Sequence, residues 1–122
     1  MNGLERRVST GQSFYVSITG LRFKRFWSIF AFLRFSFPSS RAAQRAEGNL
    51  YAAVKPIHRV HHTLTAWESK EAIGHFKYDG THLQAIQAFK KYFTGKRYGY
   101  ETHSLPTWEN VHQLRQEKGI EF

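Results

Sequence analysis

The sequence has 122 residues, of which 41% are hydrophobic and 16% aromatic, with a formal net charge of +9 and no cysteine. This length suits one domain with a genuine core and leaves little room for a second. The absence of cysteine excludes disulfides and thiolate metal ligands. Residues 1–60 carry ten basic and two acidic residues, against eight and seven in the remainder. Such a basic segment favours an anionic partner, nucleic acid or a membrane surface, although it also serves as a solubilising surface.

The chain begins with a polar segment. Residues 1–12 lack the apolar core of a signal peptide, so we interpret them as a flexible N-terminal segment and expect a cytoplasmic protein. Residues 13–23 then alternate, with Phe14, Val16 and Ile18 on one face, which predicts a first strand.

Residues 26–37 form an aromatic, mostly apolar run bracketed by basic residues. A membrane-spanning helix needs about 20 apolar residues, so this run is too short to cross a bilayer. Helical spacing gathers one apolar stripe that includes Phe30, but Trp27 falls outside it. The surplus aromatic residues therefore need a second surface against which to be buried. That surface could be a subunit, a hydrophobic ligand or a lipid interface. Pro38 ends this helix, and a polar helical piece follows as far as Gly48.

The rest of the chain alternates between strand and helix patterns. Pro56 places the second strand at an edge of the sheet, and Ser69 caps the helix that follows the third strand. The predicted elements are strands at 49–57, 62–67 and 96–103, helices at 70–78 and from Thr81 to a stop at Thr94-Gly95, and a helical tail at 105–122.

This order predicts an α+β, ferredoxin-like β-α-β-β-α-β domain over residues 13–104, with an antiparallel four-stranded sheet. Two helices cover one face of that sheet. The other face is expected to stay open, and its apolar residues predict burial against a second copy.

The junction between the third strand and its helix holds the first candidate site residues. Trp67 at the end of the strand suits either a core or a pocket wall. His82, at a helix N-terminus, is held neutral by the helix dipole and can then accept a proton, whereas the alternative is a capping or surface role. His58, His61 and His62 form H-x-x-H-H, but a structural zinc needs four ligands, so no metal site is predicted.

The same junction resembles the antibiotic biosynthesis monooxygenase family of the dimeric α/β-barrel superfamily. The matching residues are Trp67, Glu68, Ser69, Glu71, Ala72, His75 and His82. FYVSITGLRF and QRAEGNL in the first half also resemble the spheroidene monooxygenase-like branch.

The resemblance implies a homodimer whose sheets pack face to face, and a pocket between each sheet and its helices. Trp67 lies where quinone-forming members keep an active-site tryptophan, but their partner asparagine falls at Thr63 and their Tyr and Arg fall near Ile73 and Gln87. In haem-degrading members the pocket tryptophan falls at Phe76 and the proximal histidine at Ile86. His82, one turn before Ile86, is the alternative haem ligand. The cofactor is expected to be none or haem.

We hypothesise a monooxygenase-like protein that binds a hydrophobic, polycyclic or isoprenoid ligand and oxidises it with O2. Trp67 would position the ligand, with His82 or His62 handling protons. The expected pocket residues are Trp27, Phe30, Thr63, Thr65, Trp67, Ile73, Phe76 and Ile86. The alternatives are a non-catalytic ligand-binding protein, a peripheral membrane protein that uses residues 22–37, and a nucleic-acid-binding module. No RNP-like pattern is found, which argues against nucleic acid as the partner.

Overall fold

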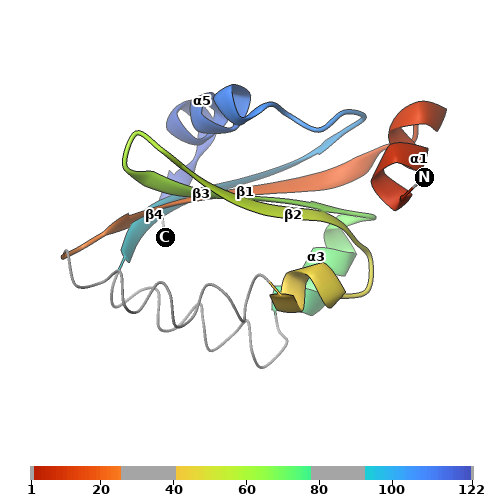
Figure 1. Cartoon of the computed structure of the whole chain (residues 1–122), viewed down its shortest axis with the longest axis horizontal. Coiled ribbons are helices and arrows are strands. Elements are labelled where there is room, and N and C mark those ends of the chain that lie inside the picture. Colours follow the sequence, from red (N-terminus) through yellow and green to blue (C-terminus); the bar gives the residue numbers. More distant parts are fainter. Residues whose placement is uncertain (1, 26–40, 78–92, 122) are drawn as a thin grey trace.

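The computed structural model describes residues 2–25, 41–77 and 93–121. Its centre is a single antiparallel sheet in the order β2-β3-β1-β4-β5 (Figure 1). The strands are β1 (Phe14–Phe23), β2 (Asn49–Ile57), β3 (Val60–Trp67), β4 (Phe93–Thr102) and the short β5 (Ile120–Glu121). The order of the first four strands is that of a ferredoxin-like domain, so the predicted fold class is confirmed; the fifth strand was not predicted.

Several local predictions are also confirmed. The Ser69 hydroxyl accepts from the backbone N–H of Ala72 at 3.1 Å, which caps α3 (Lys70–Lys77). Gly48 has φ +83, and an added Cβ would lie 2.7 Å from the Cβ of Ala72, so only glycine lets the chain pass this close to α3. β2 is an edge strand, as Pro56 requires.

Other boundaries differ from the prediction. Residues 3–10, interpreted as part of a flexible segment, form helix α1 (Gly3–Thr10), capped by the Asn2 side chain. β4 begins at Phe93, so Thr94 and Gly95 belong to a strand and do not stop a helix. β3 already begins at Val60, because the preceding turn uses two residues only.

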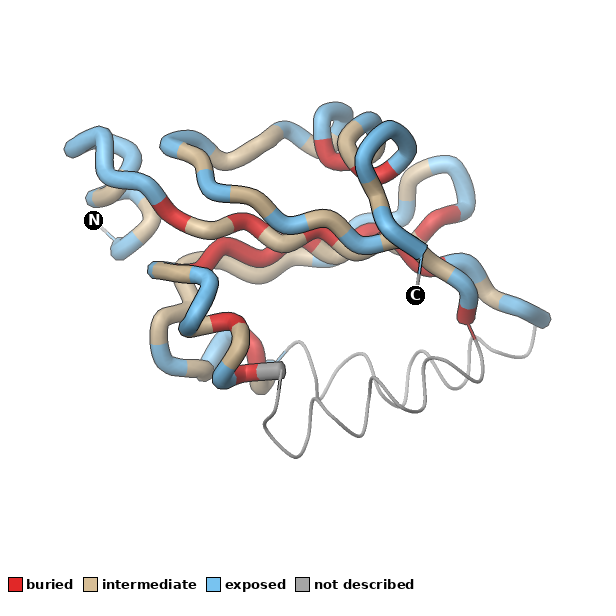
Figure 2. Tube along the Cα trace, turned by 180° about the vertical axis from the view of Figure 1, so that it is seen from behind, coloured by how far each residue is buried: buried red, intermediate tan, exposed pale blue. Residues whose placement is uncertain are grey.

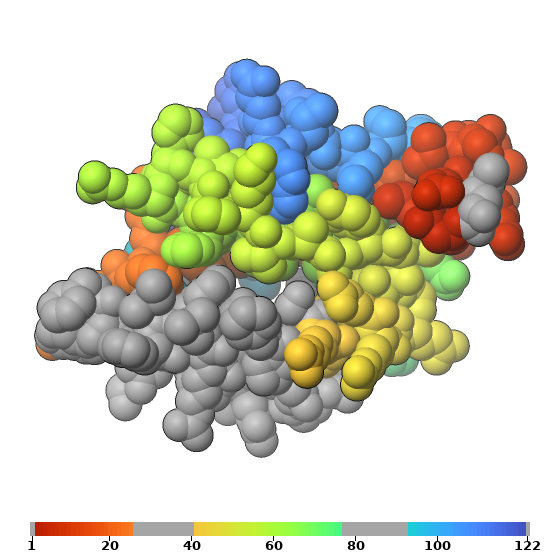
Figure 3. Space-filling view, in the orientation of Figure 1, coloured from red at the N-terminus to blue at the C-terminus, as the bar shows by residue number. Residues whose placement is uncertain are grey.

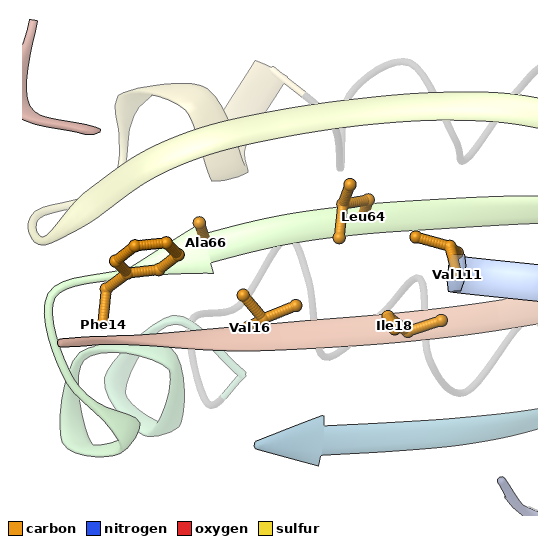
Figure 4. Packing of buried hydrophobic residues seen from close by; sticks show 6 residues of the cluster. All are labelled: Phe14, Val16, Ile18, Leu64, Ala66 and Val111. Carbon is orange, nitrogen blue, oxygen red and sulfur yellow. The ribbon is translucent and has the colours of Figure 1, made fainter. Parts of the chain in front are cut away.

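The tail forms α5 (Trp108–Lys118), which begins after the Thr107 cap and ends at Gly119. The expectation that the second face of the sheet stays open was wrong, because α5 lies on that face (Figure 1). Val111 of α5 packs on this face with a cluster of residues from β1 and β3, shown in Figure 4: Phe14, Val16, Ile18, Leu64 and Ala66. A helix of the same chain therefore covers part of the apolar surface that a second copy was expected to bury.

The opposite face of the sheet is covered by α3 and by the helical residues 41–45. The buried positions run along the central strands between these two layers, and the outer surfaces of α1, α5 and the β2–β3 hairpin are exposed (Figure 2). The sheet thus has an α5 face and an α3 face, each with its own core cluster. None of the helices in the described ranges has the length and apolar character needed to span a bilayer.

Candidate functional site

Trp67 lies at the centre of the α3 face. Its side chain is fully buried and packs in one cluster with Ala43, Ile73 and Phe76. The rings of Trp67 and Phe76 are tilted by 31° with centroids 5.1 Å apart. The structure therefore brings together three of the predicted pocket residues, Trp67, Ile73 and Phe76.

The indole Nε1–H of Trp67 is buried and has no hydrogen-bond acceptor within the part of the chain that the structure describes. Buried polar groups are satisfied in the great majority of cases, and an unmade hydrogen bond costs roughly 1–3 kcal/mol. A tryptophan that serves only the core normally directs its N–H to a protein acceptor. This donor is the strongest chemical feature of the α3 face.

A row of side chains leads away from Trp67 along β3. Successive side chains of a strand point to opposite faces, so Thr65, Thr63 and His61 share the α3 face with Trp67. Thr65 is buried and Thr63 half-buried, which places both predicted residues on the predicted face. His61 stands six residues from Trp67, about 20 Å along the strand.

His61 shares this face of β3, although the sequence analysis considered it only as a metal ligand. Its ring contacts Phe23 with centroids 4.7 Å apart, and burial lowers its pKa, which keeps it neutral. The alternation of β3 was the signal that could have identified it, because only odd-numbered residues of this strand share the face of Trp67.

His62 lies on the other side of the sheet. Its side chain contacts His112 and Arg115 of α5, so it cannot reach a ligand beside Trp67 within one protomer. The predicted partnership of His62 and Trp67 in one pocket is therefore not what this structure shows. The register explains the difference, because residues 62 and 67 of one regular strand face opposite ways.

Four further predicted site residues lie outside the described residues: Trp27, Phe30, His82 and Ile86. Their roles stay predictions. Among the described residues there is no group of three or more His, Asp or Glu side chains placed to hold a metal ion.

The α5 face carries a cavity of about 270 Å³ between β4 and α5. Its walls are mostly polar: Tyr100, Thr102, Ser104, Pro106, Asn110, Gln113, Leu114 and Glu117. It lies on the face opposite Trp67 and was not predicted.

No protein-family model and no curated protein matches the sequence. Solved structures do match the fold. One is SnoaB, a cofactor-independent oxygenase from Streptomyces nogalater, with a TM-score of 0.65 and 10% identity over 79% of this chain and 97% of that chain. Another is a putative antibiotic biosynthesis monooxygenase from Nitrosomonas europaea, with a TM-score of 0.64 and 15% identity over 75% of this chain and 99% of that chain.

A putative antibiotic biosynthesis monooxygenase from Chloroflexus aurantiacus is similar over 77% of this chain and 93% of that chain, with a TM-score of 0.59 and 16% identity. Identities this low establish the fold alone. The chain accordingly has the ferredoxin-like fold of antibiotic biosynthesis monooxygenases.

Proposed function

We propose that this protein binds a hydrophobic, oxygen-bearing polycyclic or isoprenoid molecule on the α3 face and oxidises it with O2. The observation that carries the proposal is the buried Trp67 Nε1–H, which has no acceptor among the described residues. A carbonyl or hydroxyl oxygen of a ligand would satisfy this donor, while the apolar side chains of Ile73 and Phe76 would contact the ligand skeleton. The fold shared with monooxygenases supports the reaction class by analogy.

For a polycyclic ligand with a ring CH2 group, the reaction would balance as a conversion of CH2 to a carbonyl. The carbon loses two hydrogens and gains one oxygen atom, and the second oxygen atom of O2 leaves as water. Trp67 would orient the ligand through its oxygen substituent. His82 would take up the proton released from the carbon.

The isoprenoid alternative rests on the resemblance of FYVSITGLRF and QRAEGNL to the spheroidene monooxygenase-like branch. A row about 20 Å long from Trp67 to His61 suits an elongated molecule lying along β3.

The proposed reaction does not need haem. The family position of the haem-ligating histidine falls at Ile86, whose side chain has no ligating atom. His82, the alternative ligand, is here assigned the proton transfer.

Binding tests the proposal directly. The probes are 1,8-dihydroxyanthraquinone, which offers carbonyl and hydroxyl oxygens, and anthracene, which has a similar ring skeleton and no oxygen. Trp67→Phe keeps an aromatic ring but removes the N–H, so it should weaken quinone binding about 3- to 30-fold, the equivalent of one buried hydrogen bond. Its effect on anthracene should be small. Trp108→Phe on α5 is the matched control and should leave both affinities unchanged.

Oxidation is measured separately with the corresponding anthrone in an oxygen electrode. The proposal expects one O2 consumed per quinone formed, faster with the protein than in buffer. Quinone binding without accelerated uptake would instead identify a non-catalytic ligand-binding protein. Equal quinone affinity in wild type and Trp67→Phe would contradict the proposed site.

A further inference from the structure

The α5 face holds a cationic cluster that the proposed oxidation does not use. Gly20 of β1 and His62 of β3 are opposite each other in the sheet, and the Arg115 side chain of α5 lies over Gly20. A Cβ on Gly20 would overlap the Arg115 side chain. Glycine thus leaves the room through which Arg115 crosses the strand at this position.

The hydrogen bonds of His62 fix the proton positions of its neighbours. The Nδ1 of His62 lies 3.0 Å from the carbonyl oxygen of Val60, an acceptor only, so Nδ1 carries the hydrogen and donates it. The Nε2 of His62 then carries a lone pair and can only accept. It accepts from Arg115 Nε at 3.1 Å, and it lies 3.2 Å from His112 Nδ1.

It follows that His112 also carries its hydrogen on Nδ1, since two facing lone pairs would repel each other. The Nε2 of a neutral His112 is consequently unprotonated. If His112 takes up a proton, Nε2 becomes a new donor without disturbing its contact with His62. His62 is not available as a metal ligand, because its Nε2 lone pair already accepts a hydrogen bond from Arg115.

Two arginines and a further histidine lie around His112. Arg115 is buried, and its only hydrogen bond among the described residues is the one to His62. Arg22 lies two residues beyond Gly20 on the same strand face and is exposed. Desolvation is the main cause that lowers the pKa of His112 and of Arg115, and the charge of Arg22 lowers both further. His58 of the β2–β3 turn completes the cluster, with its ring centroid 4.9 Å from that of His112 (Figure 3 shows this turn beside α5).

The neighbouring basic and acidic groups are unevenly balanced. The sheet places Lys55 beside His62 and Lys96 beside Gly20 on this face. The acidic groups nearby are Glu121, which is paired in register with Lys96 at the sheet edge, and Glu117, which lines the cavity between β4 and α5. No ion pair joins a carboxylate to the cluster in the described ranges, and the negative end of the α5 dipole offsets only part of its charge. A buried guanidinium without a counter-charge is unfavourable unless an anion binds.

The turn that contains His58 has a backbone conformation that its residues disfavour. His58 and Arg59 have φ angles of 50° and 65°, the left-handed values that a two-residue hairpin turn requires. Asn-Gly is the usual pair here, and other side chains cost roughly 1–2 kcal/mol per residue. Strained non-glycine residues in a turn are a recurring feature of functional sites.

We propose that His58, His112, Arg22 and Arg115 form a binding site for a doubly charged tetrahedral oxyanion, either free phosphate or a phosphomonoester. The two arginines supply permanent charge, and His112 supplies one further donor when it takes up a proton. A carboxylate has one charge and two oxygens, so it matches two arginines and two histidines less well. The site is on the face opposite Trp67, so this proposal does not depend on the proposed oxidation.

Sulfate is the best probe of this site, because its double charge does not change between pH 5.5 and 8. Binding to the full chain is measured by calorimetry and by ¹⁵N NMR of the histidine side chains, with sodium chloride holding the ionic strength constant. We expect one saturable site that shifts the His112 resonances. The affinity should rise roughly 3- to 10-fold for each pH unit from 7.5 to 6, tenfold being the limit for one proton taken up.

Matched variants separate a site from general charge attraction. Arg22→Gln and His58→Asn should each weaken sulfate binding at least threefold, and both are compatible with folding, because Arg22 is exposed and asparagine tolerates a left-handed turn. His112→Gln should remove most of the pH dependence. Arg97→Gln is the control: it removes the same charge from the same sheet, on the α3 face, and should change nothing.

Parallel titrations with phosphate and glycerol 3-phosphate at pH 7.5 distinguish the two possible ligands. Tighter binding of glycerol 3-phosphate points to a phosphomonoester, whereas equal binding points to free phosphate. Failure to saturate, equal loss in Arg22→Gln and Arg97→Gln, or an affinity independent of pH would overturn the proposal. Tighter binding of a single-stranded oligonucleotide, lost in Arg22→Gln, would also overturn it, because the cluster would then serve nucleic acid.

Discussion

Two adjacent histidines of β3 show how the alternation of one strand separates the chemistry of the two faces. His61 lies with Trp67 on the α3 face, whereas His62 lies under α5 and accepts from Arg115. From the sequence, we expected His62 and Trp67 to act in one site. The odd spacing of five residues between them was sufficient to exclude this placement.

The burial of His62 has a consequence for stability. Desolvation lowers the pKa of His62 to about 4. The hydrogen bond to Val60 opposes this shift, and the smaller effects of Arg115, His112 and His61 add to it. The unfolded chain therefore takes up a proton near pH 6.5 that the folded chain takes up only near pH 4. The free energy of unfolding should fall by roughly 3 kcal/mol as the pH falls through this window, since one pKa unit corresponds to about 1.4 kcal/mol.

Urea denaturation at pH 7.5, 6.5, 5.5 and 4.5 measures this slope. His62→Gln cannot titrate and should be less stable at pH 7.5 but show a flatter profile. His75→Gln, which removes an exposed histidine, should keep the wild-type slope. A His62→Gln profile as steep as that of wild type would contradict the role given to His62.

At the scale of elements, the capped starts of α3 and α5 follow from the sequence because Ser69 and Thr107 are local signals. The placement of α5 does not follow, since Trp108, Val111 and Leu114 share one side of a helix whatever surface they meet. The turn at His58–Arg59 was also missed. Neither residue favours a positive φ, so local propensity pointed to a longer loop.

The contact between α5 and the sheet depends on Val111, which is fully buried against β1 and β3. Val111→Ala removes two methyl groups and should lower the free energy of unfolding by about 2 kcal/mol, including the cavity left behind. Gln113→Ala on the exposed side of the same helix should change it by less than about 0.5 kcal/mol. Urea denaturation checks both, and equal losses would show that α5 does not pack as described.

At the scale of the whole molecule, the predicted fold class is confirmed, but the surroundings of the sheet are only partly as expected. A predicted homodimer with open sheets packed face to face must accommodate α5, because Val111 already packs on part of that face. No local pattern distinguishes a tail that folds back from one that extends away, which is why the sequence left this surface open.

Sedimentation equilibrium tests the homodimer. We expect twice the chain mass of 14.3 kDa at micromolar concentrations, with the partner bound around α5 and the uncovered part of the sheet. A mass of one chain at 100 micromolar would contradict the homodimer and would mean that α5 takes the place of the second copy.

The most direct test of a ligand site on the α3 face follows the Trp67 indole proton by ¹H–¹⁵N NMR. Single Trp→Phe variants assign the three indole signals. Adding 1,8-dihydroxyanthraquinone should move the Trp67 Nε1–H signal downfield as the proton gains an acceptor, with the Trp108 signal unchanged and no comparable shift with anthracene. Saturable quinone binding that leaves the Trp67 signal in place would contradict the site.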